Sequence, residues 1–182
     1  MTDAPQAEFP RPVAIDALAA GAVLTGDASA AEREALARRF AIPAVRALRF
    51  SAEARPWGPG GWRVDGKVEA ALTQTCVVTL EPVETAFQEP FTRYFAPAGR
   101  LEQAAELLDP ETDEDPEPLG SAIDFGEIAA EAAALAMDPY PRRPDAGFEG
   151  AVQGPPGVRA MTDEDARPFA RLAALRKTRG EA

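Results

Sequence analysis

Apolar and polar residues alternate most regularly over residues 62–76. Val64, Val68, Leu72 and Cys76 fall on one side of an extended chain, whereas the other side holds mainly charged residues and threonines. A period of two with one apolar side is typical of an antiparallel strand that buries one face. The pattern therefore predicts a long, half-buried strand over this segment.

Two flanking segments extend this strand into a meander. Residues 45–54 alternate in the same way, and a Pro- and Gly-rich turn at 56–61 separates them from the long strand. Glu81-Pro82 marks a second reversal, and residues 83–95 then predict a return strand that is bent near Pro90. The three segments are expected to form an antiparallel meander with a long central hairpin.

Two helices are predicted from their N-terminal signals. Ser29 is followed three residues later by Glu32, which is the spacing of a capping box, and predicts a helix over 30–40. Asp124 and Glu127 have the same spacing and predict a second capping box and a helix over 125–137. The apolar stripe expected to be buried comprises Phe125, Ile128, Ala132, Leu135 and Ala136.

Together these elements predict an α+β fold. A small antiparallel sheet, which could curl toward a barrel, would carry the two helices. Residues 1–144 are expected to form this domain, including a mobile acidic loop at 98–121. Residues 145–182 are expected to form a Gly- and Pro-rich linker and a short, basic C-terminal helix that starts at Pro168.

Charge is distributed unevenly over the 182 residues, whose net charge is −11. Residues 98–121 hold eight acids against Arg100, or −7, and few large apolar groups, so this loop is predicted to be disordered, with room for one helical turn at 101–108. Residues 167–182 hold five bases against one acid, or +4. A central acidic segment and a basic tail are therefore the charged features that a partner could recognise.

The composition excludes most catalytic and metal chemistry. Histidine is absent and Cys76 is the single cysteine, so neither a Cys–His nucleophile nor a Cys/His zinc site can be assembled. Cys76 lies on the apolar side of its strand and is expected to be packed. No catalytic residue, cofactor or metal is predicted, and the chain is not expected to be an enzyme.

The sequence predicts a cytoplasmic protein. No stretch approaches the roughly 18 consecutive apolar residues that a membrane-spanning helix needs, and the N-terminus lacks the pattern of a signal peptide. A single unpaired thiol fits a reducing compartment.

Three groups of residues are candidates for binding a partner. Arg142-Arg143 is held extended between Pro141 and Pro144, and paired guanidinium forks suit phosphates or carboxylates. The alternative is that both arginines are solvated or pair with the acidic loop. The other candidates are the basic tail residues Arg171, Arg176 and Lys177, which could contact RNA, and the loop acids Asp109, Glu111, Asp113, Glu114, Asp115 and Glu117, which could hold a basic protein.

The order of three motifs resembles a known family. The first is Thr75-Cys76-Val77-Val78-Thr79-Leu80-Glu81-Pro82-Val83, followed by residues 91–95 and the acidic loop. The second runs from Ile123 to Pro144, and the third is the tail at 167–176. In this order and spacing the chain resembles the YceD family, also called the large ribosomal RNA subunit accumulation protein family, in its alphaproteobacterial form.

The resemblance implies a non-enzymatic factor in large ribosomal subunit biogenesis that promotes accumulation or processing of 23S rRNA. Its partner would be a large-subunit precursor, reached through a ribosomal protein or through rRNA, with no role for DNA or a membrane. The alternative is an acidic module that binds a basic ribosomal protein without a direct role in rRNA. Many members of the family carry a C-x-x-C pair at the hairpin and a further cysteine after the Pro-rich segment, which suggests a metal knuckle. Here Thr79 stands at the second position and residues 139–150 contain no thiol.

We therefore predict that the purified protein contains no stoichiometric zinc, because one cysteine and no histidine leave too few ligands for a zinc site. Elemental analysis of the full chain measures this directly, and one zinc ion per chain would refute it.

Overall fold

The computed structural model describes residues 7–108, 115–147 and 157. By its internal contacts the chain divides into two units, Met1–Pro144 and Asp145–Ala182. The predicted C-terminal helix lies outside the described residues. The fold below is that of the first unit.

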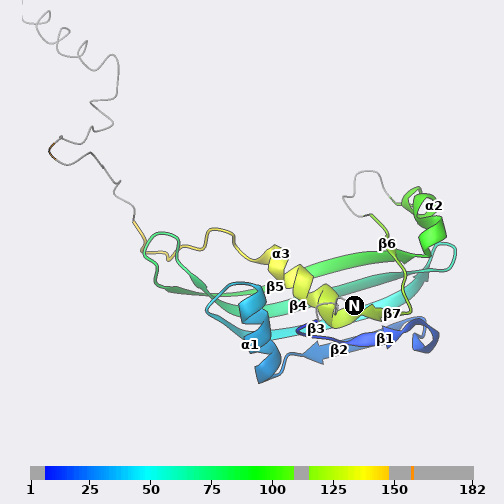
Figure 1. Cartoon of the computed structure of the whole chain (residues 1–182), viewed down its shortest axis with the longest axis horizontal. Helices are drawn as coiled ribbons and strands as arrows, with labels where there is room; N and C mark the ends of the chain where they lie inside the picture. The colour runs from blue at the N-terminus through cyan, green and yellow to red at the C-terminus, as the bar shows by residue number, and fades with distance from the viewer. Residues whose placement is uncertain (1–6, 109–114, 148–156, 158–182) are drawn as a thin grey trace, which may run out of the picture. The chain divides into compact units, whose positions relative to one another are not determined.

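The first unit has the predicted α+β architecture (Figure 1). Five strands form one sheet in the order β2-β3-β4-β5-β6, in which every neighbouring pair is antiparallel except β5 and β6. Strands β1 and β7 form a separate two-stranded sheet. The main sheet does not close, so the barrel-like form that the sequence left open is not adopted. The strands are β1 (Pro12–Ala14), β2 (Ala22–Asp27), β3 (Ala44–Trp57), β4 (Gly61–Thr75), β5 (Pro82–Ala96), β6 (Glu117–Pro118) and β7 (Ala122–Asp124). The helices are α1 (Ala30–Arg39), α2 (Leu101–Ala105) and α3 (Phe125–Ala136), with 3₁₀ turns η1 (Ile15–Ala17) and η2 (Ala98–Arg100).

The predicted meander is the centre of the sheet. Strands β3, β4 and β5 are joined by two hairpins, and they extend further than the sequence pattern indicated. Pro56 and Trp57, predicted to belong to a turn, continue β3, because the reversal needs no more than Gly58, Pro59 and Gly60. Both glycines of this turn have positive φ angles, +55° and +83°, which glycine adopts without strain.

Strand β2 was not predicted from the sequence. It pairs with β3 over six residues, and its inward positions are Ala22, Leu24 and Gly26, of which only Leu24 is large. Val23 faces outward and is 67% exposed. The usual alternation of large apolar and polar residues is therefore absent, which explains why the pattern gave no signal.

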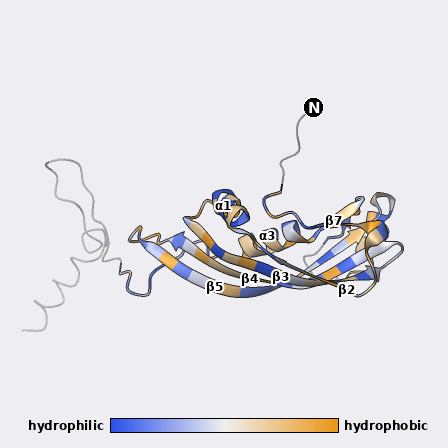
Figure 2. Cartoon of the chain, turned by 90° about the horizontal axis from the view of Figure 1, so that it is seen from below, coloured by the Kyte–Doolittle hydropathy of each residue, from blue (hydrophilic) through white to orange (hydrophobic). Residues whose placement is uncertain are grey.

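All the core side chains lie on one face of the sheet. Val64, Val68 and Leu72 of β4 are fully buried in the core, and helices α1 and α3 lie over the same face of the sheet (Figure 2). The opposite face of the sheet carries the charged and threonine side chains predicted from the alternation. This division into one buried and one exposed face is what the period of two indicated.

Helix α3 buries a row of alanines together with Phe125 and Ile128, and leaves Leu135 outside. Phe125, Ile128 and Ala132 are buried as predicted, and Ala129, Ala130 and Ala133 are buried with them. Leu135 is 78% exposed, so its predicted burial is wrong. It lies roughly 120° around the helix from Ala129, the middle of the buried arc, by the geometry of 3.6 residues per turn. Small residues let the helix approach the sheet closely, and Leu135 is left at its side.

The predicted capping box of α1 is confirmed. Glu32 N donates to Ser29 Oγ, and Ser29 N donates to the Glu32 carboxylate at 2.7 Å. The same carboxylate accepts a hydrogen bond from Arg11 Nη1 at 2.7 Å. The Arg11 guanidinium, more than the cap itself, lowers the pKa of Glu32 to about 2.

The second predicted capping box forms only in part. Asp124 Oδ1 accepts hydrogen bonds from Gly126 N (3.0 Å) and Glu127 N (3.1 Å), so Asp124 caps α3 as predicted. The Glu127 carboxylate does not return to the cap residue, because it binds the guanidinium of Arg39 at the end of α1. The N-terminal segment adds a further donor to the cap, since Arg11 N donates to Asp124 Oδ1 at 2.8 Å.

Gly126 is required where this segment crosses the start of α3. A Cβ atom at this position would lie 1.8 Å from the backbone oxygen of Phe9, whose side chain is fully buried. We predict that Gly126→Ala lowers the free energy of unfolding by about 3 kcal/mol, the cost of overpacking where a backbone must move. The matched control is Gly99→Ala, because a Cβ there meets nothing within 4 Å. Urea denaturation monitored by circular dichroism measures both variants, and equal stability of the two would contradict the prediction.

Candidate partner-binding site

Two adjacent hollows lie where β5 passes beneath the end of α3. Their volumes are about 380 and 410 Å³, and both are lined by Thr92, Arg93 and Leu135. Together they form the β5–α3 groove, whose floor is residues 89–94 and whose sides are formed by Glu131, Ala132, Leu135, Ala136, Asp115 and Glu117. The exposed Leu135 thus stands beside a concave surface rather than in open solvent.

Carboxylates dominate the charge of this groove. Glu89, Asp115, Glu117 and Glu131 line it against one base, Arg93, which gives a local net charge of −3. Arg93 Nε lies 3.4 Å from Glu117 Oε1, and Arg93 Nη1 donates to the backbone oxygen of Thr92 at 3.0 Å. The Arg93 guanidinium therefore pairs with one carboxylate of the groove, that of Glu117, and also bonds to the backbone of β5.

The pKa of Glu117 is raised above its ordinary value, and burial of the carboxyl group is the main cause. Burial raises this pKa, the Arg93 guanidinium opposes the rise, and the neighbouring Glu131 carboxylate adds to it. Two carboxylates that share one cation are not fully neutralised. An added cation in the groove would stabilise the ionised form of Glu117.

The structure places two of the six candidate loop acids at this groove. Asp115 and Glu117 line it, whereas Asp109, Glu111, Asp113 and Glu114 lie outside the described residues. Helix α2 lies where one helical turn was considered, at 101–108, and strand β6 falls within the segment predicted as a loop. Glu89 and Glu131 were not selected from the sequence. They come from a strand and a helix that are far apart in the chain, and no local pattern relates them to the loop.

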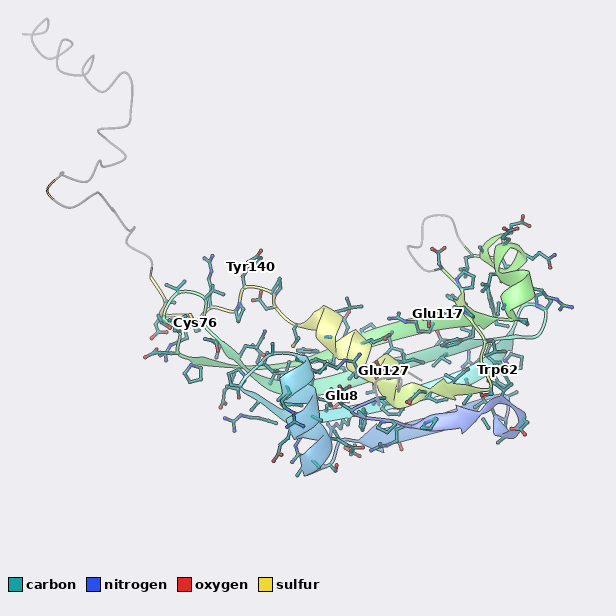
Figure 3. All side chains as sticks on the ribbon, viewed as in Figure 1. Glu8, Trp62, Cys76, Glu117, Glu127 and Tyr140 are labelled. Carbon is teal, nitrogen blue, oxygen red and sulfur yellow. The ribbon has the colours of Figure 1, made fainter. Side chains whose placement is uncertain are left out.

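The arginine pair lies at the other end of the sheet. Arg143 Nη1 is 2.8 Å from Glu81 Oε2, so this guanidinium pairs with the β4–β5 turn. Arg142 is exposed and has no hydrogen bond or ion pair within the described residues. Figure 3 shows the neighbouring Tyr140 beside Cys76 at one end of the sheet and Glu117 toward the opposite end. The structure thus separates Arg142 and Arg143 from Asp115 and Glu117, the loop acids that it describes. Arg171, Arg176 and Lys177 lie outside the described residues.

The Pro-rich segment after α3 is tied to the β4–β5 turn by backbone contacts. Val77 N donates to Pro141 O at 2.9 Å, and the buried Gln74 side chain donates through Nε2 to Asp138 O at 2.9 Å. These bonds hold residues 138–143 against the turn that contains Cys76. The first and second sequence motifs, at residues 75–83 and 123–144, are therefore in contact in the folded chain.

The Cys76 sulfur is surrounded by hydrogen-bond donors. Its side chain is fully buried, as predicted, and Thr79 N lies 3.4 Å from Sγ. Hydrogen bonds from the Thr79 hydroxyl and from the backbone amides of Thr79 and Arg143 lower the pKa of Cys76 to about 6. Loss of hydration opposes ionisation, but these bonds to the thiolate outweigh it.

Comparison with known proteins identifies the family. The family model described as "Large ribosomal RNA subunit accumulation protein YceD" matches residues 64–176, which is more than half of the chain. The chain belongs to the YceD family. No curated protein and no solved structure matched the chain.

The match confirms the resemblance based on the three sequence motifs. It covers the β4–β5 hairpin, the groove and the Pro-rich segment of this YceD-family chain, and it extends into the tail. The family description refers to ribosomal RNA of the large subunit and names no reaction. Among the described residues, no helix combines the length and apolar character needed to cross a membrane.

The residues around Cys76 do not fit a metal ion. Thr79 offers a hydroxyl and an amide as donors to the sulfur, where a second thiolate would be needed. Within the part of the chain that the structure describes, no three His, Cys, Asp or Glu residues are grouped closely enough to hold a metal. In this member of the family, hydrogen bonds to one sulfur hold the turn.

We predict that stability rises with pH because of Cys76. A thiol whose pKa is about 6 in the folded state and near 9 when unfolded releases its proton earlier in the folded state. The unfolded state therefore binds more protons between these pKa values, so the contribution is complete above pH 9 and is lost as the pH falls through 6. Urea denaturation at a series of pH values measures the slope, which Cys76→Ser should reduce. Thr79→Val is the matched variant, because loss of its hydroxyl should raise the thiol pKa in an ultraviolet titration. A wild-type thiol pKa near 9 would contradict this account.

Proposed function

We propose that this protein is a non-enzymatic, cytoplasmic factor in large ribosomal subunit biogenesis that promotes the accumulation or processing of 23S rRNA. The observation that carries the proposal is the family match over residues 64–176. The Cys76 side chain is fully buried, so its sulfur is not placed to meet a substrate.

The charge of the protein favours a ribosomal protein over rRNA as its direct partner. A net charge of −11 repels RNA phosphates at long range, so general electrostatic docking on rRNA is disfavoured. The same charge attracts the very basic proteins that assemble with rRNA. Part of this negative charge, a local net charge of −3, is gathered in the groove on the described surface.

A second candidate function follows from the same groove. The protein could bind a basic ribosomal protein without any direct role in rRNA, as a module that shields its charge. The two candidates differ in one measurable consequence. Deletion of the gene lowers the ratio of 23S to 16S rRNA if the first is right and leaves it unchanged if the second is right.

Affinity purification from cell extract tests the proposal itself. Tagged full-length protein should recover large-subunit precursor particles, detected by their 23S rRNA. Recovery of no ribosomal RNA or ribosomal protein above the level of an untagged control would refute a role in subunit biogenesis.

We predict that the acids of residues 109–117 matter more for this association than the basic tail does. One variant replaces Asp109, Glu111, Asp113, Glu114, Asp115 and Glu117 by the corresponding amides, and the other carries Arg171→Ala, Arg176→Ala and Lys177→Ala. Recovery of precursor particles should fall more in the acid variant, because a basic protein loses its electrostatic attraction. Arg142→Ala is a third variant, which reports on a local phosphate contact. If the tail or Arg142 variant loses association while the acid variant keeps it, direct RNA contact replaces the protein route.

A further inference from the structure

The outer edge of β5 is open for most of its length. Strand β4 pairs with β5 from residue 82 to residue 95, whereas on the other side, within the described residues, β6 pairs with Phe95 and Ala96. An open edge presents unpaired backbone groups to which another chain can add as a strand. The β5–α3 groove runs along this open edge just before β6 begins.

The hydrogen bonds show which β5 residues face the open side. Cys76 N donates to Glu81 O at 2.8 Å where the hairpin closes, and bonded positions then alternate along an antiparallel pair. Odd-numbered residues of β5 therefore bond to β4, and even-numbered residues face outward. Two hydrogen bonds made by even-numbered residues agree with this assignment: Thr92 O accepts from Arg93 Nη1, and Ala96 O accepts from Leu119 N. Gln88 and Thr92 thus direct both backbone groups to the open side, and Pro90 directs its carbonyl there.

Leu135 provides an apolar wall above this edge. It is 78% exposed, at the end of a helix whose other large apolar residues are buried, and it lines both hollows. The nearly buried ring of Phe91 lies on the floor of the first hollow. A strand lying along β5 would cover Leu135 and remove apolar surface from water.

The charge of the groove selects the occupant. Four carboxylates against Arg93 attract lysine and arginine side chains and repel phosphates. Arg93 already occupies the position that such a partner would take, since its guanidinium donates to Thr92 O and pairs with Glu117. A bound strand would supply the same two features, a backbone N–H for Thr92 O and a cation for the carboxylates.

We propose that an extended, basic peptide segment of a partner protein binds in the β5–α3 groove as an added strand on the edge of β5. Alternate side chains of the added strand face the helix side, where an aliphatic residue covers Leu135 and a basic residue meets Glu117 and Glu131. The inference deepens the proposed function and rests on it for the identity of the partner as a basic protein.

A labelled synthetic peptide that repeats Lys-Thr-Val-Thr places lysine and valine in turn on one side of a strand, and fluorescence anisotropy with the full-length chain measures its binding. Two matched peptides separate the contributions. One has glutamate in place of lysine, and the other keeps its charges but carries N-methyl groups on alternate backbone nitrogens. The lysine peptide should bind, and both matched peptides should bind at least about tenfold more weakly, because charge attraction and strand hydrogen bonds each exceed about 1.4 kcal/mol.

Variants locate the binding on the protein. Leu135→Ser and Glu131→Gln should each weaken binding of the lysine peptide by about fivefold, the loss of roughly 1 kcal/mol. Val23→Ser and Glu34→Gln are the controls, because both residues are exposed and lie outside the groove. They should leave the affinity within about twofold of the wild type.

Several outcomes would overturn the inference. In the peptide assay they are binding of no peptide, equal binding of the glutamate or N-methylated peptide, and wild-type affinity in the groove variants. Two further outcomes would assign the groove to another occupant. Single-stranded RNA could displace the lysine peptide by binding there more tightly, or the protein could form a dimer that Leu135→Ser abolishes.

Particle recovery from cells separates this result from the proposed function. Groove variants that lose the peptide but keep the precursor particles overturn the groove as the route and leave the function intact. Peptide binding without particle recovery leaves the groove intact and overturns the function.

Discussion

The attachment of α3 to the N-terminal segment is the contact on which the rest of the fold depends. Asp124 Oδ1 accepts from Arg11 N and also caps the first turn of α3, while Gly126 lets the backbone of Phe9 cross that turn. Arg11 also reaches Glu32 at the start of α1. One segment thus fixes both helices over the same face of the sheet, where the whole core lies. Because α3 is anchored at its start, its last turn projects over β5, and this places Glu131 and Leu135 beside the groove.

The face of the sheet without helices balances its own charges, in contrast to the groove. Arg49 pairs with Glu69, Arg55 with Glu53, and Arg63 with Asp65. Trp57 and Tyr94 pack at the end of the same face with ring centroids 4.7 Å apart. The first pair bridges β3 and β4, and the other two join residues two apart on one strand, and charges paired in this way attract little from solution. The unbalanced charge of the described surface near β5 therefore lies in the groove, where two acids of a loop meet acids of a strand and a helix.

Much of the fold was predictable from local patterns. The period of two gave the β3–β4–β5 meander, and the Ser29–Glu32 spacing gave the start of α1, because both features act through neighbours in the chain. Leu135 was predicted to be buried because the apolar stripe was continued from Ile128 and Ala132 at helical spacing, whereas the buried face of α3 is centred on Ala129. Strand β2 escaped notice because Ala22 and Gly26 take two of its three inward positions.

The candidate site was predictable only in its components. Asp115 and Glu117 were selected because the acids of their loop stand out by number. Nothing in the local sequence pairs them with Glu89 or Glu131, whose proximity depends on the packing of α3 across β5. Arg143 shows the opposite case, because its predicted alternative partner was the acidic loop and its observed partner is Glu81. Charge runs in a sequence therefore indicate which side chains are available to a partner, and tertiary packing decides which of them act together.

A carboxylate groove on a strand edge has a consequence for how a basic partner would be released. A net charge of −3 over one strand's width holds a basic segment less tightly than rRNA can, because each nucleotide adds a phosphate and many contacts release counterions together. If a basic segment binds as proposed, its backbone bonds to β5 would add affinity that does not depend on its charge, and the charge of −11 would oppose long-range attraction of the protein to RNA. Such a segment would be protected from weak, scattered phosphate contacts, and yet it would transfer to a folded rRNA site that offers more of them. Direction in such a transfer comes from the difference in charge density between the two sites, and no chemical step is needed to drive it.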